Sequence, residues 1–333
     1  NRIPSDLSDF SLYGGLVRPV RMRHVPAVSM QSLLVRTEVE EGRASASVSM
    51  ELYNPTGHEA TAALTVELLD PRGCLLRTHE TTLSTGRSSG ELGAFTVGDP
   101  ELWSPDSPSL YRMRVSMDCD GYTTTMETHF GLRSFEFIPH GPFMLNGRRL
   151  LLRGTHRHED HAGLGAAMPA DLIREEMELM KEMGVNFIRL GHYQQSREVL
   201  NLCDELGILV WEEIPWCRGG LGDETYREQC RRMLRNMITQ HVNHPSVILW
   251  GLGNENDWEG DFEHFDEQEI RGFMSELHQL SHQLDPSRMT AIRRCDFCKD
   301  VVDVYSPSIW AGWYRGKFTD YKAASRSDRK SVV

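Results

Sequence analysis

The sequence has no long uninterrupted hydrophobic run and no surplus of basic residues. No apolar stretch in its 333 residues reaches the roughly 18 that indicate a membrane-spanning helix, so we expect no membrane partner. Acidic residues outnumber basic ones, 48 to 36, and the formal net charge is -12. Nucleic-acid-binding proteins usually present a basic patch or stripe, so we expect no nucleic-acid partner either. Hydrophobic residues still make up 39% of the chain, enough for a sizeable core.

Cysteines are few and unevenly spaced. There are seven, and this odd count at irregular spacing gives no disulfide framework. Cys295 and Cys298 have the spacing of half a zinc site, but the sequence contains no second Cys-x-x-Cys pair. The sequence therefore predicts buried free thiols, and it implies no metal and no cofactor.

The chain begins with Asn1 rather than Met, and no secretory hydrophobic region precedes it. Both ends look cut, so we expect a fragment of a longer protein. The localisation is unknown from these residues.

Residues before about 138 alternate apolar and polar side chains with a period of two. Ala46, Val48, Met50 and Leu52 alternate with serines and Glu51, and the runs 62–68 and 111–117 repeat the pattern. Turn-forming residues such as Asp120-Gly121 separate the runs. This spacing of half-buried antiparallel strands predicts an immunoglobulin-like β-sandwich over residues 27–137.

After residue 138, strand-like and helix-like segments alternate. The strand-like segments are 150–155, 186–190, 208–212, 246–251, 290–292 and 301–305, and the clearest helical segments are 169–184, 226–241 and 266–284. Alternation of this kind is typical of parallel strands joined by helical crossovers. Residues 138–333 are therefore predicted to form an incomplete (β/α)8 TIM barrel, with about six of the eight strands.

Polar and aromatic side chains gather where five of these strands end. They are His156, His158 and Asp160 after the first strand, His192 after the second, Glu212 and Glu213 after the third, Asn254 and Glu255 after the fourth, and Trp310 after the sixth. The carboxyl ends of barrel strands meet at one rim, which holds the active site. We therefore expect Arg153, His192, Glu213 and Glu255 to share that rim.

Several of these residues also have a purely structural interpretation. One of Glu212 and Glu213 can face inward and the other outward on a strand, in either order. His156, His158 and His161 have the composition of a metal site, but their carboxylate and aromatic neighbours suit sugar hydroxyls as well. We therefore assign no metal to the rim.

The pair Asn254-Glu255 is the hardest to explain by packing, because a carboxylate at the end of a buried strand is costly. A carboxylic acid in a partly dry cleft can keep a proton near neutral pH, and a neighbouring carboxamide can bind a substrate hydroxyl. Glycoside hydrolysis needs these groups and a second carboxylate, which lies about 5–5.5 Å away in retaining enzymes.

At this point the motifs resemble glycoside hydrolase family 2, which includes β-galactosidases, β-glucuronidases and β-mannosidases. They run in the family's order along nearly the whole chain: FGLR at 130–133, RGTHRHE at 153–159, IRLGHY at 188–193, CDELG at 203–207, NHPSV at 243–247 and GNEN at 253–256. The resemblance implies a jelly-roll domain, an immunoglobulin-like sandwich and a catalytic barrel. Residues 1–26 would be the remnant of the jelly roll.

The resemblance also implies roles for individual residues. Glu255 would be the general acid/base, Asn254 would bind the sugar 2-hydroxyl, and Arg189 would orient the nucleophile carboxylate. His158 and His192 would line the sugar subsite. We further assign Asp160, Arg153, Glu213 and Trp310 to substrate binding.

Three departures from the family pattern matter. Trp310 stands where many members have a tyrosine, and no magnesium-ligand pattern follows Glu213. The nucleophile glutamate of the family belongs at the end of a seventh strand, which we expect beyond Val333. The chain alone is therefore predicted to be inactive.

The leading hypothesis is a retaining exo-β-glycosidase acting on β-galactosides, with a carbohydrate as its partner. β-Glucuronides and β-mannosides are the alternatives within the family, and the full-length protein could be a homo-oligomer. A non-catalytic sugar-binding protein is the main alternative of a different class, although binding alone needs no acid such as Glu255. An adhesion module built on the sandwich would leave the polar rim unexplained.

Overall fold

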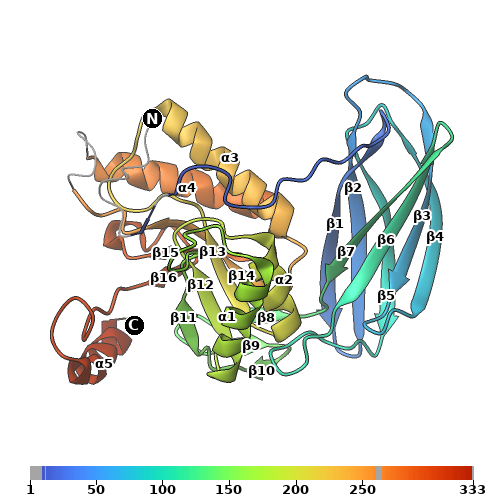
Figure 1. Ribbon diagram of the computed structural model, residues 1–333. Coiled ribbons are helices and arrows are strands. Elements are labelled where there is room, and N and C mark those ends of the chain that lie inside the picture. Colours follow the sequence, from blue (N-terminus) through green and yellow to red (C-terminus); the bar gives the residue numbers. More distant parts are fainter. Residues whose placement is uncertain (1–9, 12, 260–264, 332–333) are drawn as a thin grey trace.

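The computed structural model describes residues 10–11, 13–259 and 265–331. Residues 1–9 and 12, which belong to the predicted jelly-roll remnant, lie outside the described residues. The chain forms a β-sandwich and, beside it, a curled parallel sheet with helices packed against it (Figure 1).

Two antiparallel sheets form the sandwich, with strand orders β1-β2-β5 and β4-β3-β6-β7. Their strands are β1 (Ser29–Glu40), β2 (Arg43–Tyr53), β3 (Thr61–Leu69), β4 (Leu75–Ser84), β5 (Ser89–Gly98), β6 (Tyr111–Cys119) and β7 (Tyr122–Phe130). On β2, Ala46, Val48 and Met50 are buried between half-buried serines. Asp120 and Gly121 both have positive φ, 50° and 78°, which is the backbone of a two-residue hairpin turn. The sandwich predicted from the alternation is confirmed.

The second large sheet holds six parallel strands in chain order. They are β11 (Gly154–His156), β12 (Phe187–Leu190), β13 (Leu209–Glu213), β14 (Val247–Asn254), β15 (Met289–Arg293) and β16 (Val304–Ser306). The helices between them are α1 (Ala170–Glu182), α2 (Arg197–Leu206), α3 (Glu224–His241) and α4 (Glu267–Leu284). Because β11 and β16 are edge strands, the sheet is an incomplete (β/α)8 barrel, as predicted.

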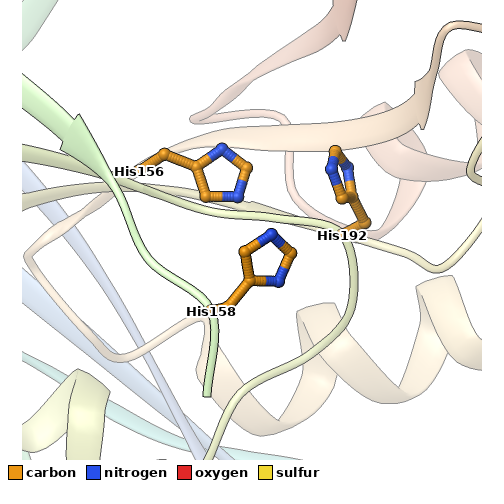
Figure 2. A group of neighbouring side chains, drawn as sticks. All are labelled: His156, His158 and His192. Atoms are coloured by element: carbon orange, nitrogen blue, oxygen red, sulfur yellow. The ribbon is translucent and has the colours of Figure 1, made fainter. Parts of the chain in front are cut away.

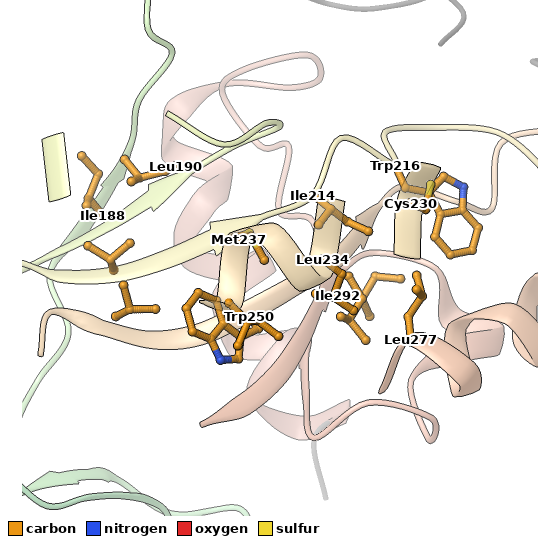
Figure 3. Packing of buried hydrophobic residues seen from close by; sticks show 14 of the residues in the cluster. Ile188, Leu190, Ile214, Trp216, Cys230, Leu234, Met237, Trp250, Leu277 and Ile292 are labelled. Carbon is orange, nitrogen blue, oxygen red and sulfur yellow. The ribbon is translucent and has the colours of Figure 1, made fainter. Parts of the chain in front are cut away.

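The main core lies between these strands and the helices. Ile188, Leu190 and Trp250 of the strands pack against Met237 of α3 and Leu277 of α4 (Figure 3). This packing holds the strands in register, so that their carboxyl ends lie together.

A small antiparallel sheet, which the sequence patterns did not predict, fills the other end of the barrel. It consists of β8 (Phe135–Phe137), β9 (Phe143–Leu145) and β10 (Arg148–Arg149). Phe143 and Leu145 pack in one buried cluster with Leu209 and Leu249, which lie early in their strands. The amino ends of the strands are thus plugged, and polar groups are left for the carboxyl ends.

The first barrel strand is shorter than predicted. The Asn186 side chain accepts a hydrogen bond from the backbone N–H of Arg153 at 2.7 Å and donates one to the carbonyl of Leu151 at 3.0 Å. These side-chain contacts replace ladder hydrogen bonds, so β11 begins only at Gly154. After β16, the 3-10 turn η3 (Phe318–Asp320) leads into α5 (Tyr321–Ser331), which lies away from the sheet (Figure 1).

All seven cysteines are unpaired, and five of them are buried: Cys119, Cys203, Cys230, Cys295 and Cys298. These five are buried free thiols, as predicted, whereas Cys74 is exposed and Cys217 is half-buried. Among the described residues, no helix is long and apolar enough to cross a membrane.

Candidate active site

Glu255 follows β14, a strand in which all eight residues are buried. Its backbone has a φ of 53°, in the left-handed region that non-glycine residues rarely adopt. Its N–H donates to the carbonyl of Arg293 at 2.9 Å, and its Oε1 accepts from Arg293 Nη1 at 2.9 Å. Glu255 is 6% exposed, so a carboxylate with an arginine partner lies just beneath the surface at the rim.

Asn254 is held from two sides by arginine. Its Oδ1 accepts from Arg189 Nη2 at 2.8 Å and from Arg293 Nη1 at 3.2 Å. Its Nδ2 donates to Cys217 Sγ at 3.4 Å, and burial raises the pKa of that thiol to about 12, so sulfur stays protonated. The carboxamide is therefore fixed in one orientation beside Glu255.

Arg189 of β12 and Glu213 of β13 form a buried ion pair under the rim. Arg189 Nη2 lies 2.8 Å from Glu213 Oε1, and Arg189 Nε lies 3.1 Å from Oε2, which makes the contact bidentate. His192 Nδ1 lies 2.9 Å from the same Oε1. Burial alone would raise the pKa of Glu213, but the Arg189 charge and the His192 hydrogen bond outweigh it and leave the pKa below its usual value. Glu213 is thus a carboxylate that positions Arg189 and His192.

The close approach of these side chains requires a glycine at position 191. A Cβ there would lie 2.9 Å from Glu213 Oε1 and 2.9 Å from His156 Cε1, closer than real Cβ atoms come. Because Gly191 has no side chain, the β12 loop can place His192 against Glu213.

Three imidazoles gather beside this ion pair, those of His156, His158 and His192 (Figure 2). The His156 and His158 rings are 4.8 Å apart between centroids, and those of His156 and His192 are 5.2 Å apart. Desolvation and the Arg189 charge lower the pKa of His156 to about 3, and desolvation and His192 lower the pKa of His158. The cluster therefore contains at least two neutral imidazoles at neutral pH.

The ligand atoms of these histidines lie within 4.8 Å of one another, so the cluster has the composition of a metal site. However, Arg189 Nη1 lies 3.2 Å from His156 Nδ1, and a guanidinium can only donate. This contact fixes a proton on Nε2 of His156, and the cationic neighbour opposes a metal ion. Neutral imidazoles in this arrangement suit hydroxyl groups better than a cation.

The N-terminal segment contacts the same loops. The Phe10 ring stacks on His158 and His192, with centroid distances of 5.6 and 5.5 Å. Arg18 Nη2 donates to Glu159 at 2.5 Å and to the Gln194 carbonyl at 2.8 Å. In Figure 1 this segment runs from the sandwich across to the helices of the barrel. It therefore fixes the loops that follow β11 and β12.

Aromatic and arginine side chains alternate beyond Glu255. The Arg294 guanidinium lies over the Trp258 ring at 5.2 Å and over the Trp310 ring at 4.8 Å. The Arg218 guanidinium lies over the Trp258 ring at 4.5 Å. Such cation–π contacts are strongest with tryptophan. Trp310 thus belongs to a wall that starts at the loop carrying Glu255.

Two of the predicted binding residues are placed differently from the rest. The Arg153 side chain is exposed and its Nε donates to the Gly184 carbonyl at 3.3 Å, ahead of β12, so it lies at the amino end of the sheet. The prediction that Arg153 shares the rim is wrong, because the residue precedes its strand instead of following it. Asp160 lies on the rim side but is exposed, and it accepts from Tyr13 Oη at 3.3 Å.

The structure brings together the remaining predicted residues, Arg189, His192, Glu213, Asn254 and Glu255, with His158 beside them. Sequence reasoning gave no role to Arg293, which contacts both Asn254 and Glu255. The available signal was its position directly after the predicted strand 290–292. It placed His156 at the rim without assigning it to substrate binding, and it gave Phe10 no role.

The other carboxylates near the rim have structural partners. Glu212 points outward, where its Oε2 lies 2.8 Å from His241 Nδ1 of α3, whereas Glu213 points to Arg189 and His192. Glu159 is 3% exposed and accepts from Arg18 and from the backbone N–H of Ser196. Both carboxylates are therefore engaged by other groups of the chain.

Comparison with known families decides what this arrangement belongs to. Residues 138–329 match the model described as "Glycosyl hydrolases family 2, TIM barrel domain", and residues 28–133 match "Glycosyl hydrolases family 2". The chain belongs to this family. The resemblance identified from the motifs is therefore confirmed.

Solved and curated members of glycoside hydrolase family 2 resemble the chain over most of its length. A crystal structure of Parabacteroides merdae β-glucuronidase has a TM-score of 0.95 and 53% identity, covering 99% of this chain and 43% of that one. A Bacteroides fragilis β-glucuronidase is 33% identical over 92% of this chain and 46% of its own length. A Thermoanaerobacterium thermosulfurigenes β-galactosidase is 31% identical over 88% of this chain and 40% of its own length. The chain thus spans less than half the length of these relatives.

Proposed function

We propose that the protein is a retaining exo-β-glycosidase that removes terminal β-linked glucuronic acid from a carbohydrate or aglycone. The observation that carries the proposal is the Asn254-Glu255 pair. It is a buried carboxamide and carboxylate at the rim of a family 2 barrel, fixed by Arg189 and Arg293. The role of each residue follows from what its atoms can reach.

In this mechanism Glu255 donates a proton to the glycosidic oxygen as the bond to the anomeric carbon breaks. Asn254 hydrogen-bonds the sugar 2-hydroxyl, and the imidazoles of His158 and His192 hydrogen-bond other hydroxyls. Glu213 holds Arg189 and His192 in place and stays ionised. The attacking carboxylate comes from outside these 333 residues, and Glu255 then removes a proton from the water that releases the sugar.

Glucuronides are proposed ahead of galactosides because the relatives with the higher identities carry that name. The 53% identical structure is a β-glucuronidase, whereas the β-galactosidase reported above is 31% identical. The galactoside preference expected from the motifs is therefore not favoured. Arg293 and Arg294 also lie at the rim, where they pair with Glu255 and Asp257.

The domain organisation is part of the proposal. We propose that residues 1–26 belong to a jelly-roll domain, 27–137 form the immunoglobulin-like domain and 138–333 belong to the catalytic barrel.

The second candidate function is a β-galactosidase, which the T. thermosulfurigenes relative supports.

The test uses the whole protein that carries this chain. We expect it to hydrolyse nitrophenyl β-glucuronide with a higher kcat/KM than nitrophenyl β-galactoside or β-mannoside. Glu255→Gln should lower turnover of an alkyl glucuronide by about 10²–10⁴-fold, the contribution of general acid catalysis. The nitrophenyl substrate needs less protonation, so its glycosylation step should lose less.

Glu259→Gln is a matched control, because Glu259 is exposed four residues further along the same loop. It should leave both rates unchanged. Equal losses for the two leaving groups in Glu255→Gln would show that Glu255 is structural. A higher kcat/KM for the galactoside would establish the second candidate.

A further inference from the structure

A second histidine cluster lies at the opposite end of the sheet from Glu255. It consists of His278 and His282 on α4 and Asp303 directly before β16. Thr290, near the start of β15, contacts both His278 and Asp303. Because β15 and β16 run parallel to β14, these residues belong to the amino ends of the strands. The cluster is therefore separate from the candidate active site.

The spacing of the two histidines places them on one face of the helix. Residues four apart are neighbours on an α-helix, and here the ring centroids are 4.7 Å apart with a T-shaped arrangement. Asp303 approaches from the adjacent loop, with its Oδ2 2.8 Å from His282 Nε2. Two imidazoles and one carboxylate thus converge from two different elements (Figure 1 shows α4 beside β15 and β16).

Hydrogen bonds fix the orientation of the first histidine. Thr290 Oγ1 has one proton, and it donates that proton to Asp303 Oδ2 at 2.9 Å. The contact of 2.8 Å between Thr290 Oγ1 and His278 Nδ1 is then a bond that His278 donates. The neutral His278 ring therefore has its lone pair on Nε2, the state in which histidine binds a metal.

The carboxylate is held in the same way. Asp303 Oδ2 also accepts from the backbone N–H of Thr290 at 2.7 Å. Metal-binding histidines and carboxylates characteristically have such outer hydrogen bonds, which orient them before the ion arrives. The proton between His282 Nε2 and Asp303 lies where an ion could replace it.

We propose that His278, His282 and Asp303 bind a divalent transition-metal ion, with Zn²⁺ the best match to two imidazoles and one carboxylate. One ring nitrogen of each histidine and one carboxylate oxygen of Asp303 lie within 4.8 Å of one another. Tetrahedral zinc with bonds of about 2.0–2.1 Å brings its ligands to about 3.3 Å apart, so modest side-chain rotation completes the site. The fourth position opens to water, since the side chains of His282 and Asp303 are 33% and 27% exposed.

The ion would join α4 to the loop before the edge strand β16. Binding at this site therefore stabilises the β15–β16 end of the sheet, independently of any glycosidase activity.

Zinc titration of the purified, metal-stripped protein by calorimetry tests the proposal. We expect the His278→Gln protein and the His282→Gln protein each to bind one zinc ion fewer than the wild type, because both histidines hold the same ion. Thr290→Val keeps the shape of the side chain but removes the hydroxyl, and it should weaken binding about 10–100-fold at unchanged stoichiometry. Zinc should raise the Tm of the wild-type protein but not that of His278→Gln.

His58→Gln is the matched control, because His58 also pairs with an aspartate, Asp120, at 3.0 Å, and among the described residues no second histidine joins that pair. It should bind zinc as the wild-type protein does. The rim histidines are a second group with the composition of a metal site. His158→Gln should therefore still bind the zinc ion assigned to His278, His282 and Asp303. Equal zinc stoichiometry and affinity in the wild type, His278→Gln and Thr290→Val would show that the cluster is a hydrogen-bonded network only.

Discussion

At the scale of single residues, Arg189 connects most of the candidate site. Its guanidinium contacts Glu213, Asn254 and His156, which come from three different strands or strand ends. Burial lowers the pKa of Arg189, but the Glu213 charge counters that effect, so each ion keeps the other charged. An ion pair of this kind orients its neighbours, because neither partner can move away without leaving the other as an unpaired buried charge.

Glu213→Gln therefore tests the pair. Removing one partner of a buried ion pair costs about 3–5 kcal/mol, and we expect a loss of this size in the free energy of unfolding at pH 7. Because the pKa of Glu213 is lowered by folding, its contribution is fully present above about pH 4.5 and is lost as the pH falls below that value. The wild type and Glu213→Gln should therefore approach each other in acid.

Urea denaturation at several pH values measures both effects. Glu127→Gln is the control, since Glu127 pairs with Arg114 on the sandwich surface, where ion pairs contribute about 0–1 kcal/mol. A loss in Glu213→Gln no larger than that of the control would contradict the positioning role.

At the scale of secondary-structure elements, the close packing of β13 against β14 places Glu213 and Glu255 at the same rim. Glu213 lies opposite Gly251 in the parallel ladder. A Cβ on Gly251 would lie 2.3 Å from Glu213 Cβ and 2.6 Å from Trp211 Nε1. β14 therefore requires a glycine at position 251, because the side chains of Trp211 and Glu213 on β13 fill the space beside it.

Gly251→Ala should consequently destabilise the barrel by about 1–3 kcal/mol, the usual cost of overpacking. It should also reduce activity of the whole protein, because Glu213 has to move. Gly272→Ala on α4 is the control: its Cβ would meet nothing within 4 Å, and alanine favours a helix by about 1 kcal/mol. Thermal unfolding should rank Gly272→Ala above the wild type and Gly251→Ala below it, and the reverse order would refute the packing argument.

At the scale of the whole molecule, the barrel sheet is open between β11 and β16, and the site depends on segments far apart in the chain. Phe10 and Arg18 reach the same loops as residues of the second half. Among the described residues, three carboxylates near the rim, Glu159, Glu212 and Glu213, are already engaged with structural partners.

Residues 1–333 expressed alone should therefore show no enzymatic turnover. Retention requires a carboxylate that attacks the anomeric carbon opposite the acid, and the engaged carboxylates cannot serve in that role. Incubation of the purified fragment with nitrophenyl β-glucuronide, β-galactoside and β-mannoside gives the measurement. Hydrolysis that persists through purification and vanishes in Glu255→Ala would mean that one of these carboxylates is the nucleophile.

The sequence by itself determined the architecture and singled out Glu255, the proposed acid. Period-two alternation in 46–52 and 111–117 predicted the sandwich strands, because one face of each strand had to be apolar. The six apolar segments after residue 138 predicted the barrel strands, and Asn254-Glu255 stood out because a carboxylate after a fully apolar strand has to be explained.

Only the tertiary structure decided which polar residues meet. Arg293 joins the site because the β14–β15 register sets Asn254 opposite it, and register depends on packing between strands that are distant in sequence. Arg153 lies outside the site because its backbone N–H donates to the Asn186 side chain and β11 begins only after it, at Gly154. His278, His282 and Asp303 converge only after α4 has folded back onto the sheet. Local patterns report which face of an element is buried, whereas contacts between elements depend on how those faces pack together.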